Sequence, residues 1–227
     1  MVETAPGLRA KTEAVGRRLL AAYGQPDWRS GLDPLSELVS TILSQNTSDT
    51  NRDVAFGRLR TRFVTWEEVR DSDPRAVVDA IRPAGLANQK APRIQEALRF
   101  ITRERGSLTL DFLADWPVEQ ARSWLSSIHG VGPKTAAIVL LFSFGMPAFP
   151  VDTHIHRVAR RLGLIGPKVS REQAHAQLAA LVDPAGYYFF HLNLIRHGRQ
   201  VCASRVPRCD ICTLRDLCDY AAGAASA

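Results

Sequence analysis

Long apolar runs are absent from this 227-residue sequence, and no stretch of it is long and apolar enough to span a bilayer. The first residues, 1–11, contain no apolar segment of the kind found in signal peptides. Cysteine is also scarce, with four residues in the whole chain. We therefore expect a cytoplasmic protein without a membrane anchor, whose thiols stay reduced instead of forming disulfides.

Signals for β-structure are missing as well. No segment sustains the alternation of apolar and polar residues that marks a half-buried strand, and neither Asn-Gly nor Asp-Gly hairpin turns occur. Internal repeats and low-complexity linkers are absent too. Apolar residues recur instead at helical spacing, as at Leu35, Leu38, Val39 and Ile42. The sequence therefore predicts an all-α fold of roughly ten short helices.

Residues that cap a first turn mark several helix starts. Asp33 and Asp73 each precede a proline, which is the order expected at the N-cap and the first helical position. Two further pairs have the spacing of a capping box: Thr65 with Glu68, and Ser170 with Gln173. The segment 136–144 is apolar on nearly all sides, so we expect this helix in the middle of a core.

Positive charge exceeds negative charge in this chain. There are 29 Lys and Arg residues against 23 Asp and Glu, which gives a formal net charge of +6 and a pI near 9.5. A basic balance favours a polyanionic partner, and nucleic acid is the first candidate. A basic surface that is merely solvated would have the same composition, so charge alone does not decide between the two.

The segment 128–135, which reads IHGVGPKT, joins two helical patterns. Gly130 and Gly132, on either side of Val131, permit a tight turn and the close approach of another backbone. Pro133 suits the first turn of the next helix, whose free N–H groups and positive dipole end form a phosphate site. Such a site would position DNA without reading its sequence. A nucleotide-binding P-loop fits less well, because it requires glycine where Pro133 stands.

Lys134 and Asp152 are candidates for catalytic chemistry. A lysine is a nucleophile only when deprotonated, and both a helix N-terminus and a partly dry pocket lower its pKa. The alternative is a helix-start lysine that only contacts phosphate. Asp152 begins the helix after Pro150, and an N-cap alone would explain it. The catalytic interpretation requires its carboxylate to face Lys134, where it would take a proton or stabilise positive charge on a sugar.

The four cysteines lie close together near the C-terminus, with spacing 6-2-5: Cys202, Cys209, Cys212 and Cys218. Four thiolates in one loop-rich segment can surround a single metal centre, and both zinc and iron–sulfur sites accept four cysteines. Zinc sites more often pair two short-spaced knuckles, and only Cys209 with Cys212 has that spacing, which favours iron–sulfur. Arg205 and Arg208 in the same loop would either contact phosphate or offset the negative charge of the cluster.

The hairpin at 128–135, the stretch Val-Asp-Thr-His at 151–154 and the 6-2-5 cysteine spacing together resemble the endonuclease III family of helix-hairpin-helix DNA glycosylases. The resemblance covers most of the chain. It implies two helical lobes with a DNA cleft between them. A six-helix barrel with the helix-hairpin-helix motif would cover 26–146. The other lobe, 1–25 with 147–227, would hold a [4Fe-4S] cluster on the four cysteines.

The resemblance also implies an activity in base excision repair, that of a bifunctional DNA glycosylase and AP lyase. A monomer, associated with the nucleoid, would act on double-stranded DNA that contains a damaged base or an abasic site. Lys134 would attack C1′, expel an oxidised pyrimidine and form a Schiff base, and β-elimination would follow. Asp152 would activate Lys134 or stabilise the oxocarbenium-like state.

Two further residues match DNA-binding positions of the family. Gln45 would fill the gap left by the flipped base, and Leu86 would prop the duplex open as an apolar wedge. Without the resemblance, Gln45 is a polar residue at a helix end and Leu86 is a loop leucine packed in the core. The sequence departs from the family pattern Gln-x-Thr-Asp by one extra residue between Thr47 and Asp49. It also departs at three other positions: Ala84, His129 and Val206.

Two other functions remain open at this point. One is a mismatch glycosylase, which removes thymine or uracil opposite guanine, or adenine opposite oxidised guanine. The relatives that remove adenine generally lack a lysine at the position of Lys134, which argues against them. The other is a non-catalytic DNA-binding protein that uses the hairpin as a phosphate clamp, and it predicts salt-sensitive binding without strand cutting.

Overall fold

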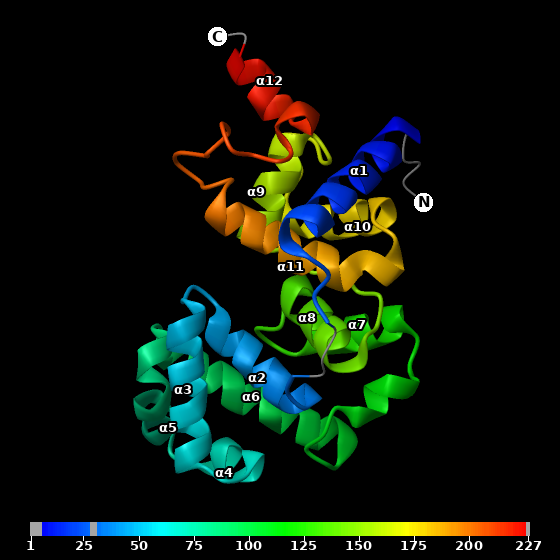
Figure 1. Ribbon diagram of the computed structural model, residues 1–227. Coiled ribbons are helices and arrows are strands. Elements are labelled where there is room, and N and C mark those ends of the chain that lie inside the picture. Colours follow the sequence, from blue (N-terminus) through cyan, green and yellow to red (C-terminus); the bar gives the residue numbers. More distant parts are fainter. Residues whose placement is uncertain (1–5, 28–30, 226–227) are drawn as a thin grey trace. The chain divides into compact units, whose positions relative to one another are not determined.

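The structure, a computed structural model, describes residues 6–27 and 31–225. All regular elements in these residues are helices, twelve α-helices and four 3₁₀ helices, which confirms the predicted all-α fold (Figure 1). The described residues form two compact units, one within 30–146 and the other within 1–29 and 147–227. No helix in the described part of the chain is long and apolar enough to cross a membrane.

In the unit within 30–146, individual helices each pack against several others. Its elements are α2 (Pro34–Ser44), α3 (Asp49–Arg62), α4 (Trp66–Asp71), α5 (Pro74–Ile81), η1 (Arg82–Ala84), α6 (Ala87–Arg105), η2 (Asp111–Asp115), α7 (Val118–Ser127) and α8 (Pro133–Phe144). Helix α2 packs against α3, α6 and α8, while α4 and α5 pack against α6. Residues 136–141 of α8 are all buried, so its apolar sequence places it in the core as predicted.

The predicted helix starts are present, and each has its capping hydrogen bond. Asp33 Oδ1 accepts from the Ser36 N–H at 2.9 Å, and Asp73 Oδ1 accepts from the Arg75 N–H at 2.9 Å. Both predicted capping boxes are formed, with reciprocal hydrogen bonds: Thr65 with Glu68, and Ser170 with Gln173. Because a cap satisfies backbone donors that the helix leaves free, these local contacts fix where the helices begin.

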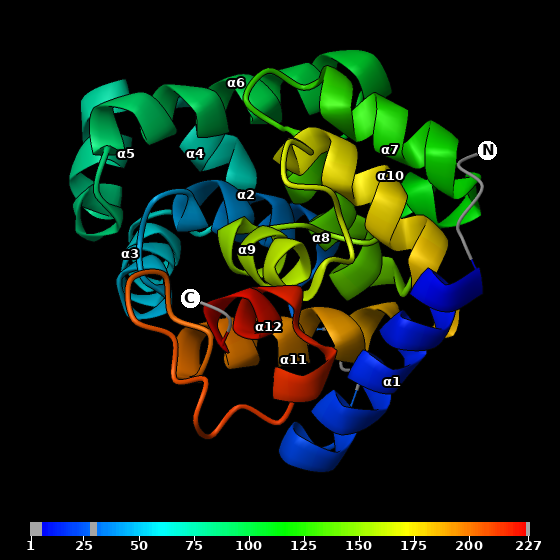
Figure 2. The same ribbon diagram turned by 90° about the horizontal axis from the view of Figure 1, so that it is seen from above.

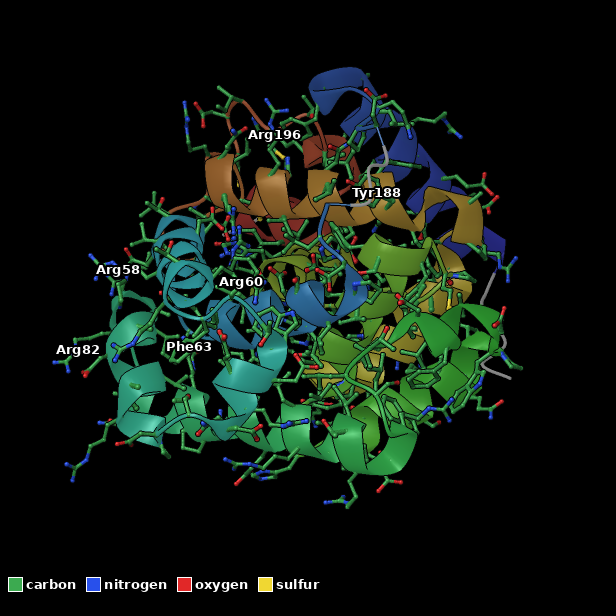
Figure 3. The ribbon with its side chains drawn as sticks, turned by 90° about the horizontal axis from the view of Figure 1, so that it is seen from below. Arg58, Arg60, Phe63, Arg82, Tyr188 and Arg196 are labelled. Atoms are coloured by element: carbon green, nitrogen blue, oxygen red, sulfur yellow. The ribbon has the colours of Figure 1, made fainter. Side chains whose placement is uncertain are left out.

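Some of the positive charge of this unit lies on its surface. Arg58 on α3 and Arg82 on η1 are exposed and extend outward, whereas Phe63 is buried (Figure 3). Arg60 instead lies over the ring of Trp66, with its guanidinium carbon 4.5 Å from the ring centroid. The arginines of this unit therefore have two environments: some extend into solvent and others pack on aromatic rings.

The second unit joins segments from both ends of the chain. Its elements are α1 (Pro6–Tyr23), α9 (Thr153–Leu162), α10 (Arg171–Leu181), η3 (Pro184–Gly186), α11 (Tyr187–Gln200), η4 (Arg215–Leu217) and α12 (Asp219–Ala225). Helix α11 packs against α1 and α9, and α12 packs against α9 (Figure 2). Val15 and Leu19 of α1 are fully buried, as is Leu194 of α11. The N-terminal helix thus contributes to a core completed by the C-terminal segment.

Helix α1 is also tied to the loop that carries the cysteines. Arg18 forms a bidentate pair with Asp216, with Nη2 to Oδ2 at 2.7 Å, and donates to the Thr213 carbonyl at 3.0 Å. Lys11 Nζ contacts Asp219 Oδ1 at 2.6 Å. Exposed ion pairs contribute little individually. The bidentate geometry at Arg18, together with its backbone acceptor, nevertheless fixes the position of the loop against α1.

Candidate functional site

The loop between α7 and α8 forms the predicted tight turn. Gly130 has φ +84°, in the left-handed region that favours glycine, and a Cβ there would lie 3.2 Å from Arg93 Cδ. The Val131 N–H donates to the Ile128 carbonyl at 3.0 Å. Gly132 is exposed, but the Val131 side chain is buried, with 4% exposed. The Val131 side chain therefore cannot contact a ligand at this turn, and any contact made by Val131 must use its backbone.

Lys134 lies in the first turn of α8, directly after Pro133, and its side chain is half-buried. Gly132 is the N-cap and provides no side chain to bond the first N–H groups of the helix. The backbone N–H groups of Lys134 and Thr135 are at the positive end of the helix dipole. This turn therefore combines an amine with an electrostatic environment that attracts phosphate.

Glu37 on α2 is a carboxylate near Lys134 that the sequence analysis missed. Burial raises the pKa of Glu37, while a hydrogen bond from Thr41 and the charges of Arg52 and Lys134 act in the opposite direction. The Thr41 Oγ1 lies 3.2 Å from Glu37 Oε1. An acidic residue in a first helical turn is explained by the helix dipole alone, so the sequence offers no signal for this proximity.

Gln45 follows α2 and lies against the hairpin. Its Nε2 is 3.4 Å from the Gly130 carbonyl, and its Oε1 is 3.3 Å from Arg93 Nη1. The next residue, Asn46, is exposed and has φ +54°. The structure thus brings Gln45 and the hairpin together, and Asn46 is the exposed side chain at this turn.

Leu86 lies at the N-cap of α6 and is 47% exposed, so the alternative of a leucine packed in the core is wrong. Its φ is +50°, an uncommon conformation for a bulky residue. Ala84, two residues earlier, is fully buried. The loop between η1 and α6 therefore anchors Ala84 in the core and presents Leu86 to solvent.

Helix α6 braces the hairpin at a second point. His129 Nδ1 lies 2.9 Å from Glu96 Oε2, and both side chains are exposed. Arg93, one turn earlier on α6, donates to Gln45, and its side chain leaves little space for a Cβ at Gly130. Of the predicted DNA-binding residues in this unit, Gln45, Leu86 and the hairpin are thus all held by α6.

Asp152 is the N-cap of α9, in the other unit. Its Oδ1 accepts from the Ile155 N–H at 2.7 Å, so the capping role is confirmed. The carboxylate is half-buried. His154, two residues later, lies 3.0 Å from Arg157 Nη2, and burial lowers the pKa of His154. Burial therefore disfavours the protonated form of His154, whose Nδ1 faces Arg157.

Two buried histidines fix the backbone that leads into Asp152. His191 Nδ1 lies 3.0 Å from the Pro150 carbonyl, and His175 Nδ1 lies 3.0 Å from the Phe149 carbonyl. His175 and His191 are 8% and 2% exposed. A buried carbonyl needs a donor, so each histidine satisfies one. Both histidines therefore hold the backbone that leads into Asp152.

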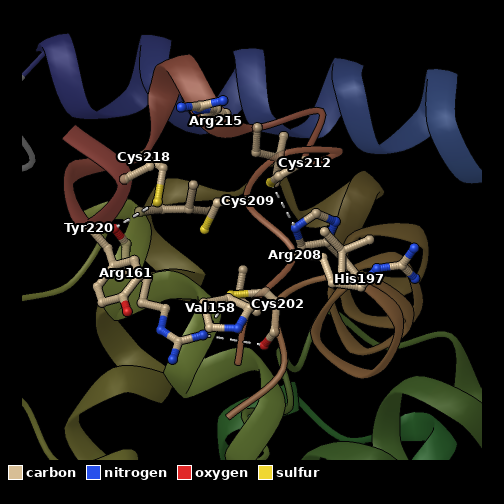
Figure 4. A pocket seen from close by; sticks show the side chains of 15 residues that line it. Val158, Arg161, His197, Cys202, Arg208, Cys209, Cys212, Arg215, Cys218 and Tyr220 are labelled. Atoms are coloured by element: carbon tan, nitrogen blue, oxygen red, sulfur yellow. Dashed lines mark hydrogen bonds between the residues drawn. The ribbon is translucent and has the colours of Figure 1, made fainter. Parts of the chain in front are cut away.

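The four cysteines are free thiols that line one pocket, and their side chains face its interior (Figure 4). Arg161 Nη1 donates to Cys202 Sγ at 3.2 Å, and His197 Nε2 lies 3.6 Å from Cys212 Sγ. Burial and the neighbouring cysteines raise the pKa of Cys212, and the same two causes raise the pKa of Cys218. A bound metal centre would supply the positive charge that stabilises thiolates in this pocket.

The donor set of the pocket fits a polynuclear metal group. Four sulfur donors in one pocket match the chemistry of iron–sulfur sites. The space among the lining side chains, including its open side, is about 370 Å³. In the described residues, no three His, Cys, Asp or Glu side chains converge on a position for one metal ion. Arg205, Arg208 and Val206 are exposed in the same loop, Val206 by 77%.

Comparisons with known proteins give one consistent result. A family model described as "HhH-GPD superfamily base excision DNA repair protein" matches residues 39–184. Endonuclease III of Sulfolobus acidocaldarius is 36% identical over 185 residues, 81% of this chain and 80% of the relative. Endonuclease III of Thermotoga maritima is 34% identical over 83% of this chain and 84% of the relative. A solved non-covalent endonuclease III–DNA complex has a TM-score of 0.83 at 24% identity, over 96% of this chain and 99% of that one.

Proposed function

The chain belongs to the HhH-GPD superfamily of base excision DNA repair proteins, and on this premise we propose that Lys134 and Asp152 perform its chemistry. It is a DNA glycosylase and AP lyase of the endonuclease III type. Its proposed substrate is double-stranded DNA with an oxidised pyrimidine or an abasic site, bound by one monomer at the nucleoid in the cytoplasm. The observation that supports the proposal most is Lys134 in the first turn of α8, directly after the hairpin.

The proposed reaction begins with the neutral amine of Lys134. Its lone pair forms a bond to C1′, and the electrons of the glycosidic bond leave with the base, which takes up a proton. Loss of a proton from the nitrogen and opening of the sugar ring give a Schiff base. Removal of a C2′ proton then expels the 3′ phosphate. Asp152 is the proposed acceptor of the lysine proton, and its charge would also stabilise the oxocarbenium-like state.

DNA binding is assigned to the residues that α6 holds and to the cysteine loop. The backbone N–H groups at Gly130 and Gly132 would bind a phosphate, while the Val131 N–H, which donates to the Ile128 carbonyl, holds the turn in shape. The exposure of Leu86 supports its role as a wedge. Gln45 is proposed to fill the gap of the flipped base, from its place against Gly130. On the other unit, the exposed Arg205 and Arg208 would contact phosphate.

We assign a [4Fe-4S] cluster to Cys202, Cys209, Cys212 and Cys218. When bound, the cluster would cross-link the cysteine loop and would take no part in removal of the base. The Arg161 guanidinium would offset its negative charge through the contact with Cys202. The pocket that all four thiols face supports the assignment.

Metal analysis separates a cluster from zinc. We expect freshly prepared protein to absorb in the visible region and to contain about four iron and four sulfide per chain. Cys212→Ser should lose this absorbance and lower the melting temperature, because the loop loses its cross-link. Ser204→Ala, an exposed change in the same loop, is the matched control. Stoichiometric zinc without iron would contradict the assignment.

A panel of defined duplexes tests the substrate. We expect single-turnover cleavage of thymine-glycol duplexes to exceed that of G·T and G·U duplexes by at least about tenfold. Base removal and strand cleavage are separate steps. Cleavage without alkali reports the lyase step, and cleavage after alkali, which breaks the strand at every abasic site, reports base removal. Preference for G·T or G·U would instead establish the mismatch glycosylase. Binding with no base removal or strand cleavage on any duplex would establish the non-catalytic DNA-binding protein.

A further inference from the structure

We propose that Lys90 is a positioning residue that holds two loops, residues 45–47 and 84–86, in fixed positions relative to each other. These are the two loops that would enter DNA. The inference rests on the proposed function, which assigns Gln45 and Leu86 to the opened base stack. Lys90 itself would contact neither DNA nor the reacting atoms. It acts through the backbone of both loops.

Lys90 is a fully buried lysine, with 1% of its surface exposed. Its Nζ donates to the Leu43 carbonyl at 2.7 Å and to the Ala84 carbonyl at 2.7 Å. A buried ammonium is costly unless it is hydrogen-bonded, and burial lowers the pKa of Lys90. Leu43 is in the last turn of α2 and Ala84 ends η1, so both carbonyls lie where helices leave acceptors unpaired. One amine therefore satisfies the ends of two elements.

Each of these acceptors lies just before a residue in a left-handed conformation. Asn46 follows Leu43 by three residues, and Leu86 follows Ala84 by two. In the described residues, Asn46 and Leu86 are the non-glycine residues with positive φ. Such conformations persist only where the surrounding structure enforces them, and they cluster at functional sites. Lys90 is the side chain that both strained turns share.

The same helix provides a structural counterpart without a predicted DNA contact. Gln95 on α6 is also 1% exposed. Its Nε2 donates to the Val69 carbonyl at 3.0 Å and to the Ser72 carbonyl at 2.9 Å, at the end of α4. Gln95 and Lys90 thus perform the same kind of backbone contact from the same helix. A purely structural role for Lys90 predicts that the two residues behave alike.

The test compares Lys90→Met with Gln95→Met. Methionine has a side chain of similar length to both residues but lacks their N–H donors. Both variants should lower the melting temperature. Only Lys90→Met should weaken binding to a duplex with a tetrahydrofuran abasic-site analogue, on the order of 10- to 100-fold, because the loops lose their alignment. Binding to an undamaged duplex of the same sequence should stay unchanged. A 2-aminopurine placed opposite the analogue reports opening of the base stack, because its fluorescence rises when it is unstacked. Binding of the wild-type protein and of Gln95→Met should raise this fluorescence, and binding of Lys90→Met should not.

Retention of abasic-site binding by Lys90→Met would overturn the inference, and so would an equal loss with Gln95→Met. Should Lys90→Met not fold, Lys90→Gln is measured instead. Its amide is one bond shorter than the lysine amine that reaches both carbonyls, so it should also weaken abasic-site binding relative to Gln95→Met, and unchanged binding would overturn the inference. A wild-type protein with no preference for the abasic-site analogue and no cleavage would refute the proposed function, and the inference with it. A wild-type protein that cleaves, beside a Lys90→Met variant that binds normally, would refute the inference alone.

Discussion

Replacing Lys134 with glutamine is expected to abolish the covalent complex that borohydride traps between this protein and abasic-site DNA. Glutamine keeps a polar side chain of similar length but has no amine, so no Schiff base can form. Lys134 is half-buried in the first turn of α8, and the residues that follow it, 135–141, form the core contacts. The fold should therefore tolerate the change. The measurement is borohydride trapping on a labelled duplex, followed by denaturing electrophoresis.

Lys168→Gln is the matched control for this experiment. The chain has four lysines, and Lys168 is exposed in a turn before α10. Trapping should be unchanged in this control. Binding of Lys134→Gln to a tetrahydrofuran duplex should also persist, because the hairpin backbone contacts remain. If the adduct survives in Lys134→Gln, another amine is the nucleophile and the assignment is wrong.

Asp152→Asn is expected to reduce single-turnover base removal by about 10²- to 10⁴-fold with little change in stability. Asparagine is as good an N-cap as aspartate, so its Oδ1 can still accept from the Ile155 N–H. What the substitution removes is the charge and the ability to accept a proton. The measurement pairs single-turnover kinetics with a melting curve of the same preparation.

Two further variants separate the cap from the chemistry. Asp73→Asn makes the same exchange at the N-cap of α5, where Oδ1 accepts from the Arg75 N–H, and should leave activity unchanged. Asp152→Ala should lose activity and also about 1 kcal/mol of stability, because the cap is gone. Full activity of Asp152→Asn would reduce Asp152 to a capping residue.

Local features of this fold could be predicted from the sequence because their causes are local. The caps at Asp33 and Asp73 involve an N–H only two or three residues away. The left-handed turn at Gly130 follows from the absence of a Cβ. The burial of 136–141 follows from a helix without a polar face. None of these requires knowledge of which helices become neighbours.

The residues that the sequence did not mark depend on contacts between distant segments. Lys90 looks like an ordinary solvated lysine near a helix start, yet its acceptors include a carbonyl 47 positions away. Glu37 comes near Lys134 only because α2 packs against α8. The exposure of Leu86 was equally undecided, since a leucine in a loop is as often buried. Helical periodicity identifies the faces that are buried but not their partners.

The ties between α1 and the cysteine loop have a consequence for biosynthesis. Helix α1 leaves the ribosome before the segment 30–146, but Asp216 and Asp219, which hold it, are made about 200 residues later. The segment 30–146 is contiguous and can fold as it emerges, whereas the nascent N-terminal helix must wait for about 200 residues of later synthesis. During that interval its apolar face, with Val15 and Leu19, is available to chaperones.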